Sequence, residues 1–287
     1  MELPKFTSTY HHEPYPAISP SKPELSTKGK KVVITGAGTG IGAATALAFA
    51  QSGASSIALL GRTERTLLAT KKAISEAYPE TEVYTYVSDI VDHSSLENSL
   101  QSFTSTVGGK LDILVANAGS LDELKPVLEC DETKWWSIFE VNIKGQFNLV
   151  KAFVPLAVHD AVIINVSSCV AHFPIVPKHS SYHGSKLAAI KVFDYLQAEN
   201  PSLAVMQFHP GAIPTSMSQK SFDSGIPKGK ADDVTLSAAF AVWCASPEAR
   251  FLKGKFLWAN WDVEELKAKA QELENSQSLT IGLLGWP

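Results

Sequence analysis

The sequence has few cysteines, no strong excess of charge and no long apolar run, and each shortage excludes a class of protein. The three cysteines are widely spaced and form no CxxC pair, which argues against a disulfide framework or a thiolate metal site and favours a reducing compartment. The formal net charge of -4 provides no basic field for nucleic acid or an anionic membrane. No apolar run approaches the roughly 18 residues of a membrane span.

The N-terminal segment and the histidines exclude two further classes. The beginning of the chain lacks the apolar core of a signal peptide. His11 and His12 are adjacent in a polar stretch, without an HExxH motif or spaced carboxylates, so no metal site is expected. We therefore expect a cytoplasmic protein that acts on small molecules and uses no metal, nucleic acid or membrane.

The chain does contain a regular alternation of apolar runs and helical patterns. Residues 1–28 carry five prolines, which predicts an irregular N-terminal arm. Residues 29–261 alternate strands with helices, which predicts an α/β fold, a single doubly wound Rossmann-type domain with a parallel sheet of about seven strands. Residues 262–287 predict a C-terminal helix and an apolar tail. The expected strands are 30–36, 55–62, 83–89, 111–119, 161–168, 203–211 and 254–260, and the expected helices are 43–53, 63–78, 95–108, 133–158, 181–199 and 232–246.

A glycine-rich turn joins the first expected strand to the first helix. Glycines let the backbone approach a pyrophosphate closely, and the N-terminus of the helix presents free N–H groups and the positive end of its dipole. The turn therefore predicts a dinucleotide site. The cofactor-binding residues expected from it are Thr35, Gly36, Gly38, Thr39, Gly40, Ile41 and Gly42.

The TGxxxGxG spacing of this turn resembles that of the short-chain dehydrogenase/reductase family, and later segments follow the same pattern. Asp89, after the third strand, matches the acidic residue that family members use on the adenine ring. Asn117, in the sequence Asn-Ala-Gly, matches the motif that supports the sheet beside the cofactor. The resemblance covers about residues 30–260, and it implies a nicotinamide cofactor.

The end of the second strand, LLGR, bears on the choice of cofactor. A carboxylate there would bind the ribose hydroxyls of NAD, whereas an arginine can pair with the 2′-phosphate of NADP. In the family pattern the carboxylate would fall at Gly61, which has no side chain, and Arg62 follows it. A guanidinium fits a phosphate as a bidentate fork, so we expect NADP(H) to be preferred over NAD(H). The alternative is that Arg62 is an ordinary solvated arginine, and Arg65 is either a second contact or helix surface.

Tyr182 and Lys186 form a YxxxK motif, whose spacing puts both side chains on one face of a helix. The ordinary pKa of tyrosine, near ~10, is too high for a base at neutral pH. A nearby ammonium and the positive nicotinamide of the oxidised cofactor favour the phenolate and lower that pKa. Tyr182 is then expected to donate a proton to a carbonyl oxygen in reduction and to remove it in oxidation. The resemblance implies that Lys186 also holds the nicotinamide ribose.

Two more residues match the catalytic set of the family. Ser168, after the fifth strand, is expected to hydrogen bond the substrate oxygen; Ser167 is the alternative, because the loop to Tyr182 is slightly longer than usual. Asn142 matches the residue that anchors a water in the proton relay to Lys186. That role accounts for an asparagine inside an expected helix, where its propensity is poor.

The segment after the sixth strand resembles the PGxxxT motif of the family. Pro210 and Gly211 begin it. The resemblance implies that the backbone of Ile213 faces the nicotinamide carboxamide and that Thr215 bonds the carboxamide or a phosphate.

Together these residues predict an NADP(H)-dependent oxidoreductase that interconverts a ketone and a secondary alcohol on a small organic substrate. The arm and the tail resemble those of fungal members, many of which tailor secondary metabolites. A family isomerase or dehydratase is an alternative, as is a non-catalytic NADP-binding sensor, although such sensors typically lose the tyrosine or the lysine. The helices around Trp135 and Tyr182 carry apolar residues on more than one face, which predicts a homodimer or homotetramer.

The C-terminal segment predicts a capped helix followed by a buried tail. Asp262 and Glu265 have the spacing of a capping box. Residues 216–231, where the substrate lid of the family lies, are poor in apolar side chains. We therefore expect the tail either to close over the rim of the active site or to pack on a distant surface or a subunit contact. The tail residues concerned are Leu279, Ile281, Leu283, Leu284 and Trp286.

Overall fold

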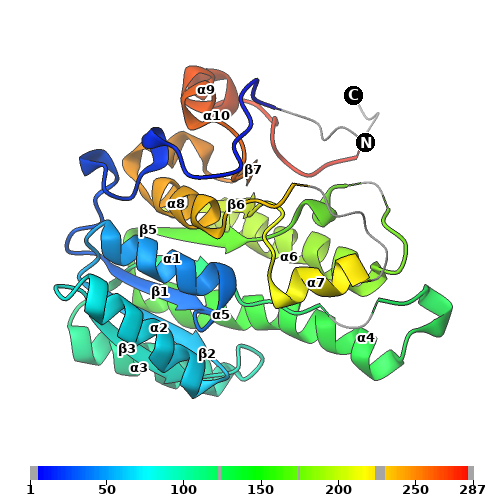
Figure 1. The fold of residues 1–287 in the computed structure, drawn as a ribbon, viewed down its shortest axis with the longest axis horizontal. Helices are drawn as coiled ribbons and strands as arrows, with labels where there is room; N and C mark the ends of the chain where they lie inside the picture. The colour runs from blue at the N-terminus through cyan, green and yellow to red at the C-terminus, as the bar shows by residue number, and fades with distance from the viewer. Residues whose placement is uncertain (1–5, 122–123, 174, 224–229, 284–287) are drawn as a thin grey trace.

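Seven strands form one parallel sheet in the computed structural model, which describes residues 6–121, 124–173, 175–223 and 230–283 (Figure 1). The order across the sheet is β3-β2-β1-β4-β5-β6-β7, and every neighbouring pair is parallel. The predicted doubly wound, Rossmann-type fold is therefore confirmed. The strands are β1 Lys31–Thr35, β2 Ser56–Gly61, β3 Glu82–Val87, β4 Leu111–Ala116, β5 Ala157–Val166, β6 Ala204–His209 and β7 Phe256–Trp258.

Helices cover both faces of the sheet (Figure 1). Successive strand residues point to opposite faces, so Val32 and Ile34 enter one apolar core and Val33 enters the other. The first core is closed by α1, α2 and α8, and the second by α3, α5 and α6. Their bounds are α1 Gly40–Gln51, α2 Glu64–Ala77, α3 His93–Val107, α5 Gly145–Phe153, α6 Ser180–Glu199 and α8 Val234–Ala245.

The order of the strands reverses direction between β1 and β4. β2 and β3 lie on one side of β1, whereas β4 begins the series on the other side. Ligands of open parallel sheets bind in the crevice at the carboxyl ends of the strands at such a point. The fold therefore brings the glycine-rich turn after β1 and Asn117 after β4 to one crevice.

The continuous helix expected over residues 133–158 is wrong in detail. The chain forms α4 Glu132–Phe139, one π turn over Glu140–Lys144 and α5, and it enters β5 at Ala157 after a short 3-10 turn. Buried Asn142 lies in the π turn. π turns inside helices are frequent at functional sites, because the extra residue redirects the side chains around it.

The N-terminal arm has no long helix or strand among its described residues, and it is packed into the larger core. Ile18 and Leu25 lie in two single 3-10 turns and are fully buried. Tyr10 forms an isolated antiparallel bridge with Trp261, next to the C-terminal segment. In Figure 1 the arm runs beside α8 and α9. It is therefore part of the folded unit.

The C-terminal segment begins with the predicted cap. Asp262 accepts a hydrogen bond from Glu265 N at 3.0 Å and starts α9 Val263–Ala268, which α10 Ala270–Glu274 follows. The Glu265 carboxylate does not complete a capping box; it accepts from the backbone N–H groups of Ser8 and Thr9. The cap therefore also fastens the arm.

The described part of the tail runs beside β7. Leu279 O accepts from Phe256 N at 2.8 Å, and Leu279 and Ile281 pack against the larger core. Leu283 is 77% exposed, and Leu284 and Trp286 lie outside the described residues. The stretch 216–231 begins with α7 Ser216–Asp223, a helix that the sequence did not predict. Of the helices that the structure describes, none has the length and apolarity to cross a membrane.

Candidate active site

The glycine-rich turn keeps the backbone bare at the start of α1. Gly36 and Gly40 have positive φ angles of 64° and 53°, which residues with a Cβ disfavour. A Cβ on Gly42 would lie only 2.3 Å from Gly36 O. Thr39 precedes α1 without capping it through its side chain, so the first N–H groups of the helix stay available to an anion. The turn thus has the form of a phosphate cradle.

Thr35 and Asn117 join the ends of β1 and β4. Thr35 Oγ1 accepts from Asn117 N and from Ala118 N, each at 3.1 Å. Asn117 Nδ2 donates to Thr35 O at 2.9 Å and to Gly36 O at 3.3 Å. These bonds fix the glycine turn against the fourth strand, so both residues set the shape of the cradle.

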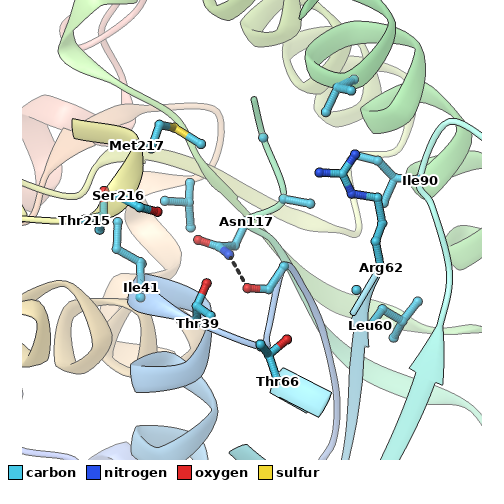
Figure 2. A pocket seen from close by; sticks show the side chains of 18 of the residues that line it. Thr39, Ile41, Leu60, Arg62, Thr66, Ile90, Asn117, Thr215, Ser216 and Met217 are labelled. Carbon is cyan, nitrogen blue, oxygen red and sulfur yellow. Dashed lines mark hydrogen bonds between the residues drawn. The ribbon is translucent and has the colours of Figure 1, made fainter. Parts of the chain in front are cut away.

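A cavity of about 360 Å³ runs from the glycine turn to the YxxxK pair, a volume typical of small-molecule sites. Figure 2 shows Asn117 in its middle, with Arg62 on one side and Ile41 and Met217 on the other. The predicted residues that line it are Gly36, Gly38, Thr39, Gly40, Ile41, Arg62, Asp89, Asn117, Tyr182, Lys186, Pro210 and Thr215. The predicted residues outside its lining are Thr35, Gly42, Asn142, Ser168, Gly211 and Ile213.

Several lining residues were missed by sequence reasoning. Thr63 and Thr66 come from the start of α2, and Met217 comes from α7. Thr66 lies so close that a Cβ on Gly38 would meet its Oγ1 at 2.3 Å. The short link between β2 and α2 could have identified Thr63 and Thr66, because it directs the start of α2 toward the crevice. Arg65, in that same turn, is exposed and lies outside the lining.

Arg62 lies at the end of β2, on the rim of the cavity. Its side chain is 72% exposed, and its Nη1 is 3.9 Å from Asp89 Oδ2. Asp89 Oδ1 accepts from Val91 N at 3.0 Å, which holds the carboxylate at the rim. An ion pair this exposed and this long is weak, so the guanidinium can exchange it for a ligand phosphate. Gly61 adds no carboxylate that would repel such a phosphate.

Tyr182, at the start of α6, lies beside Ser168, just past the end of β5. Burial raises the pKa of Tyr182 to about 12, and the hydrogen bond with Ser168 acts in the opposite direction. Ser168 Oγ also accepts from Val170 N at 3.4 Å. Ser167 lines the cavity, but its buried Oγ has no hydrogen-bond partner among the described residues. The geometry thus pairs Ser168, rather than Ser167, with the tyrosine.

Lys186 follows Tyr182 by one helical turn and is buried. Its Nζ lies 5.9 Å from the centre of the Tyr182 ring and donates to Val166 O at 3.3 Å. Burial lowers the pKa of Lys186 to about 8. The amine therefore stays mostly protonated at neutral pH, and its charge favours the Tyr182 phenolate.

Asn142 connects the π turn to the chain after β4 and to α6. Its Nδ2 donates to Ser120 O at 2.9 Å and to Ser185 Oγ at 3.0 Å, and its Oδ1 accepts from Ser120 N at 2.8 Å. A Cβ on Gly119 would lie 3.3 Å from Asn142 Oδ1 and 3.5 Å from Lys186 Nζ. The missing side chain of Gly119 thus leaves a space between these two polar atoms.

The segment after β6 forms the wall opposite Arg62. Pro210 and Thr215 line the cavity, whereas Ile213 is buried behind it. Thr215 Oγ1 accepts from Ser218 N at 3.1 Å, and Ser218 Oγ donates to Ile213 O at 2.7 Å. These bonds connect the segment to α7, which extends the wall with Ser216 and Met217.

Near this site, His172 and His209 both pack against the Trp258 ring. His172 Nε2 accepts from Trp258 Nε1 at 3.1 Å, and burial lowers the pKa of His209 to about 3, so both rings are neutral at physiological pH. Across the described ranges, no group of three or more histidine, cysteine or acidic residues could hold a metal ion.

Known proteins match this chain over most of its length. The family described as short chain dehydrogenase matches residues 30–225. A short chain dehydrogenase/reductase of Claviceps purpurea is 34% identical and covers 98% of this chain and 95% of its own length. Short chain dehydrogenase citE of Monascus ruber is also 34% identical and covers 96% of each chain.

Two solved structures extend the likeness to the fold. An alcohol dehydrogenase of Thermococcus sibiricus, complexed with 5-hydroxy-NADP, has a TM-score of 0.70 at 25% identity and covers 80% of this chain and 96% of its own. A 3-ketoacyl-ACP reductase of Sinorhizobium meliloti has a TM-score of 0.72 at 26% identity and covers 80% of this chain and 98% of its own. This chain, with its glycine turn and its Tyr182–Lys186 pair beside one cavity, belongs to the short-chain dehydrogenase/reductase family.

Proposed function

We propose that this protein is an NADP(H)-dependent oxidoreductase that interconverts a ketone and a secondary alcohol on a small organic substrate. The observation that carries the proposal is Tyr182, which borders the dinucleotide cavity, is hydrogen bonded to Ser168 and stays protonated in the neutral range. A protonated phenol beside a hydroxyl is the donor pair that a carbonyl oxygen needs as it gains negative charge.

The chain's own residues provide the proton chemistry. The Tyr182 hydroxyl donates its proton to the substrate oxygen, and the Ser168 hydroxyl hydrogen bonds the same oxygen. When bound, the reduced nicotinamide supplies the hydride. The Lys186 ammonium stabilises the phenolate that Tyr182 becomes. We infer that solvent then returns a proton to the phenolate through a water held beside Gly119, between Asn142 Oδ1 and Lys186 Nζ. In alcohol oxidation the same groups act in reverse.

The lining residues fit a dinucleotide with a 2′-phosphate. The bare glycine backbone and the open N-terminus of α1 suit a pyrophosphate, and Asp89 suits the adenine side. Arg62 is exposed on the rim, where Gly61 leaves the place of an NAD-binding carboxylate empty. The Thermococcus relative was solved with an NADP derivative, which supports the same choice here.

A small ketone of fungal secondary metabolism is our proposed substrate class. The relatives at 34% identity are fungal proteins, in keeping with the character of the arm and tail. In the cell we place the protein in the cytoplasm. The purified protein with NADPH, screened against a panel of ketones, should consume NADPH, measured by its absorbance.

Tyr182→Phe is the variant that tests the catalytic assignment. It removes the proton donor but keeps the ring, so kcat should fall by at least ~10²-fold while the Kd for NADPH stays nearly unchanged. Steady-state kinetics and a direct NADPH titration measure the two quantities. A variant that kept more than about a tenth of the wild-type turnover would show that Tyr182 is not the proton donor.

A further inference from the structure

Two adjacent histidines of the N-terminal arm are each paired with a different aspartate. His12 Nδ1 is hydrogen bonded to Asp232 Oδ1, and His11 Nε2 to Asp262 Oδ2 at 2.9 Å. Asp262 belongs to the cap of α9, whereas Asp232 lies just before α8. The two pairs resemble each other in chemistry but connect the arm to different parts of the molecule.

The Asp232 carboxylate joins His12 to the segment after β6. Its second oxygen, Oδ2, accepts from Ala212 N at 2.6 Å, and Asp232 N donates to Ala212 O at 3.2 Å. Gly211 has a φ of 96°, and a Cβ there would lie 2.6 Å from Asp232 Oδ2. The carboxylate thus lies directly against the backbone of Gly211 and Ala212, and any shift of it moves that backbone.

Asp232 depends on His12 because it is almost completely buried. Its side chain is 4% exposed, and a carboxylate removed from water needs donors on its oxygens. His12 provides one of them from the arm, and His12 O accepts from Asp233 N at 2.8 Å. Tyr10, whose ring centre is 5.4 Å from that of His12, is the other titratable arm residue facing this pair. Asp233 turns away, since its Oδ1 accepts from Thr235 N.

We propose that His12 is a positioning residue for the nicotinamide half of the dinucleotide. Through Asp232 it fixes the backbone of Gly211 and Ala212, and thereby Thr215 on the wall of the cavity and Ile213 behind it. The inference rests on the proposed function, together with the contact between the Ile213 backbone and the nicotinamide carboxamide that the family resemblance implies. The adenine half is held by Arg62, on the opposite side of the cavity (Figure 2), and by the glycine turn, which Thr35 and Asn117 fix through hydrogen bonds that do not involve Asp232.

Two ligands distinguish an effect on binding of the nicotinamide half from an effect on binding of the whole dinucleotide. NADPH carries the nicotinamide, whereas 2′-phospho-ADP-ribose keeps the 2′-phosphate and the pyrophosphate but lacks it. His12→Ala and the bulkier His12→Leu should raise the Kd for NADPH about tenfold, the typical effect of losing one interaction between side chains in contact. Both variants should leave the Kd for 2′-phospho-ADP-ribose within about twofold of the wild-type value. His12→Asn should recover most of the loss, because its amide nitrogen donates from nearly the position of Nδ1.

His11→Ala is the matched control, since it removes the other His–Asp pair from the same arm. It should leave both affinities unchanged. Equal loss of both ligands in the His12 variants, or an equal loss in His11→Ala, would overturn the proposal in favour of general anchoring by the arm. Unchanged NADPH affinity in folded His12→Leu would also overturn it. If the wild-type protein bound NADH and not NADPH, the cofactor assignment would fail. Titrations with NADH and with ADP-ribose would then test the role of His12 in the same way.

Discussion

We propose that the choice between NADPH and NADH depends on Arg62. Its guanidinium is largely solvated, and its ion pair with Asp89 is long. Exchanging this ion pair for a phosphate contact therefore costs little free energy. The absence of a side chain at Gly61 supports the same proposal, because a carboxylate there would bind ribose hydroxyls and repel a 2′-phosphate.

Arg62→Ala should weaken NADPH by about 10- to 100-fold and change NADH little, because only NADPH carries the 2′-phosphate. Fluorescence titration of both cofactors measures the effect. Arg65→Ala, from the exposed first turn of α2, is the control and should change neither affinity. Equal losses of NADPH and NADH in Arg62→Ala would rule out the phosphate contact.

Burial of the charged Lys186 amine lowers the stability of the folded protein. Burial lowers its pKa to about 8, so between that value and the ordinary lysine value of 10.5 the unfolded chain binds more protons than the folded protein. The resulting loss in the free energy of unfolding is therefore fully present below about pH 8, and it disappears as the pH rises toward the pKa of lysine in the unfolded chain. We expect the proposed proton chemistry, rather than folding, to require an amine in this position.

Lys186→Met should be more stable than the wild type at neutral pH, by about 1–3 kcal/mol, and inactive. Urea unfolding across the pH range measures the difference, which should shrink from about pH 8 upward as the wild-type amine becomes neutral in the folded state. Lys72→Met, at an exposed position of α2, should show no such trend. A less stable Lys186→Met at neutral pH would contradict the inferred desolvation.

At the scale of elements, the helix that crosses from α4 to α5 is where the site departs from regular structure. The π turn over Glu140–Lys144 puts Asn142 against Ser120 and Ser185, which are far from it in sequence. Helical periodicity predicted the helix on both sides of the turn. It could not predict the extra residue, because the hydrogen bonds that favour it come from other elements.

The C-terminal tail is the second element whose role is open to experiment. Its described part adds to β7 through Phe256 N and Leu279 O, and no described tail residue lines the dinucleotide cavity. If its end closes the substrate side, deleting residues 276–287 should raise KM strongly and leave the Kd for NADPH unchanged. Steady-state kinetics and thermal unfolding of the deletion protein measure both. Unchanged kinetics in a folded deletion protein would leave the tail as packing for β7.

The molecule as a whole carries an apolar groove on the outer surface of α5 and α6. Phe147 and Tyr195, 51% and 65% exposed, lie along it with Val154 and Val192. Exposed apolar surface of this kind is typical of subunit contacts. We expect a homodimer through this face, or a tetramer built from such dimers.

Phe147→Asp combined with Tyr195→Glu should convert the assembly to smaller species, because two charges would be buried in the contact. Light scattering coupled to size-exclusion chromatography measures the mass. Leu68→Asp, on the exposed surface of α2, is the control. A wild-type protein that is monomeric at micromolar concentration would exclude the contact.

The sequence by itself determined the features that are written within a few neighbouring residues. The alternation of strands and helices predicted the seven-stranded doubly wound sheet, the glycine spacing predicted the cradle before α1, and the four-residue spacing put Tyr182 and Lys186 on one face of α6. Each of these follows from the periodicity of a strand, a turn or a helix, which short-range sequence records directly.

Only the tertiary structure decided which polar side chains meet across the layers. Thr66 and Met217 joined the cavity, Ser168 rather than Ser167 met Tyr182, and His12 found Asp232 220 residues further along the chain. A short polar residue has the same local signature on a solvated surface as in a buried pair. Its partner is set by how the arm, the sheet and the helices pack, and no local period records that packing.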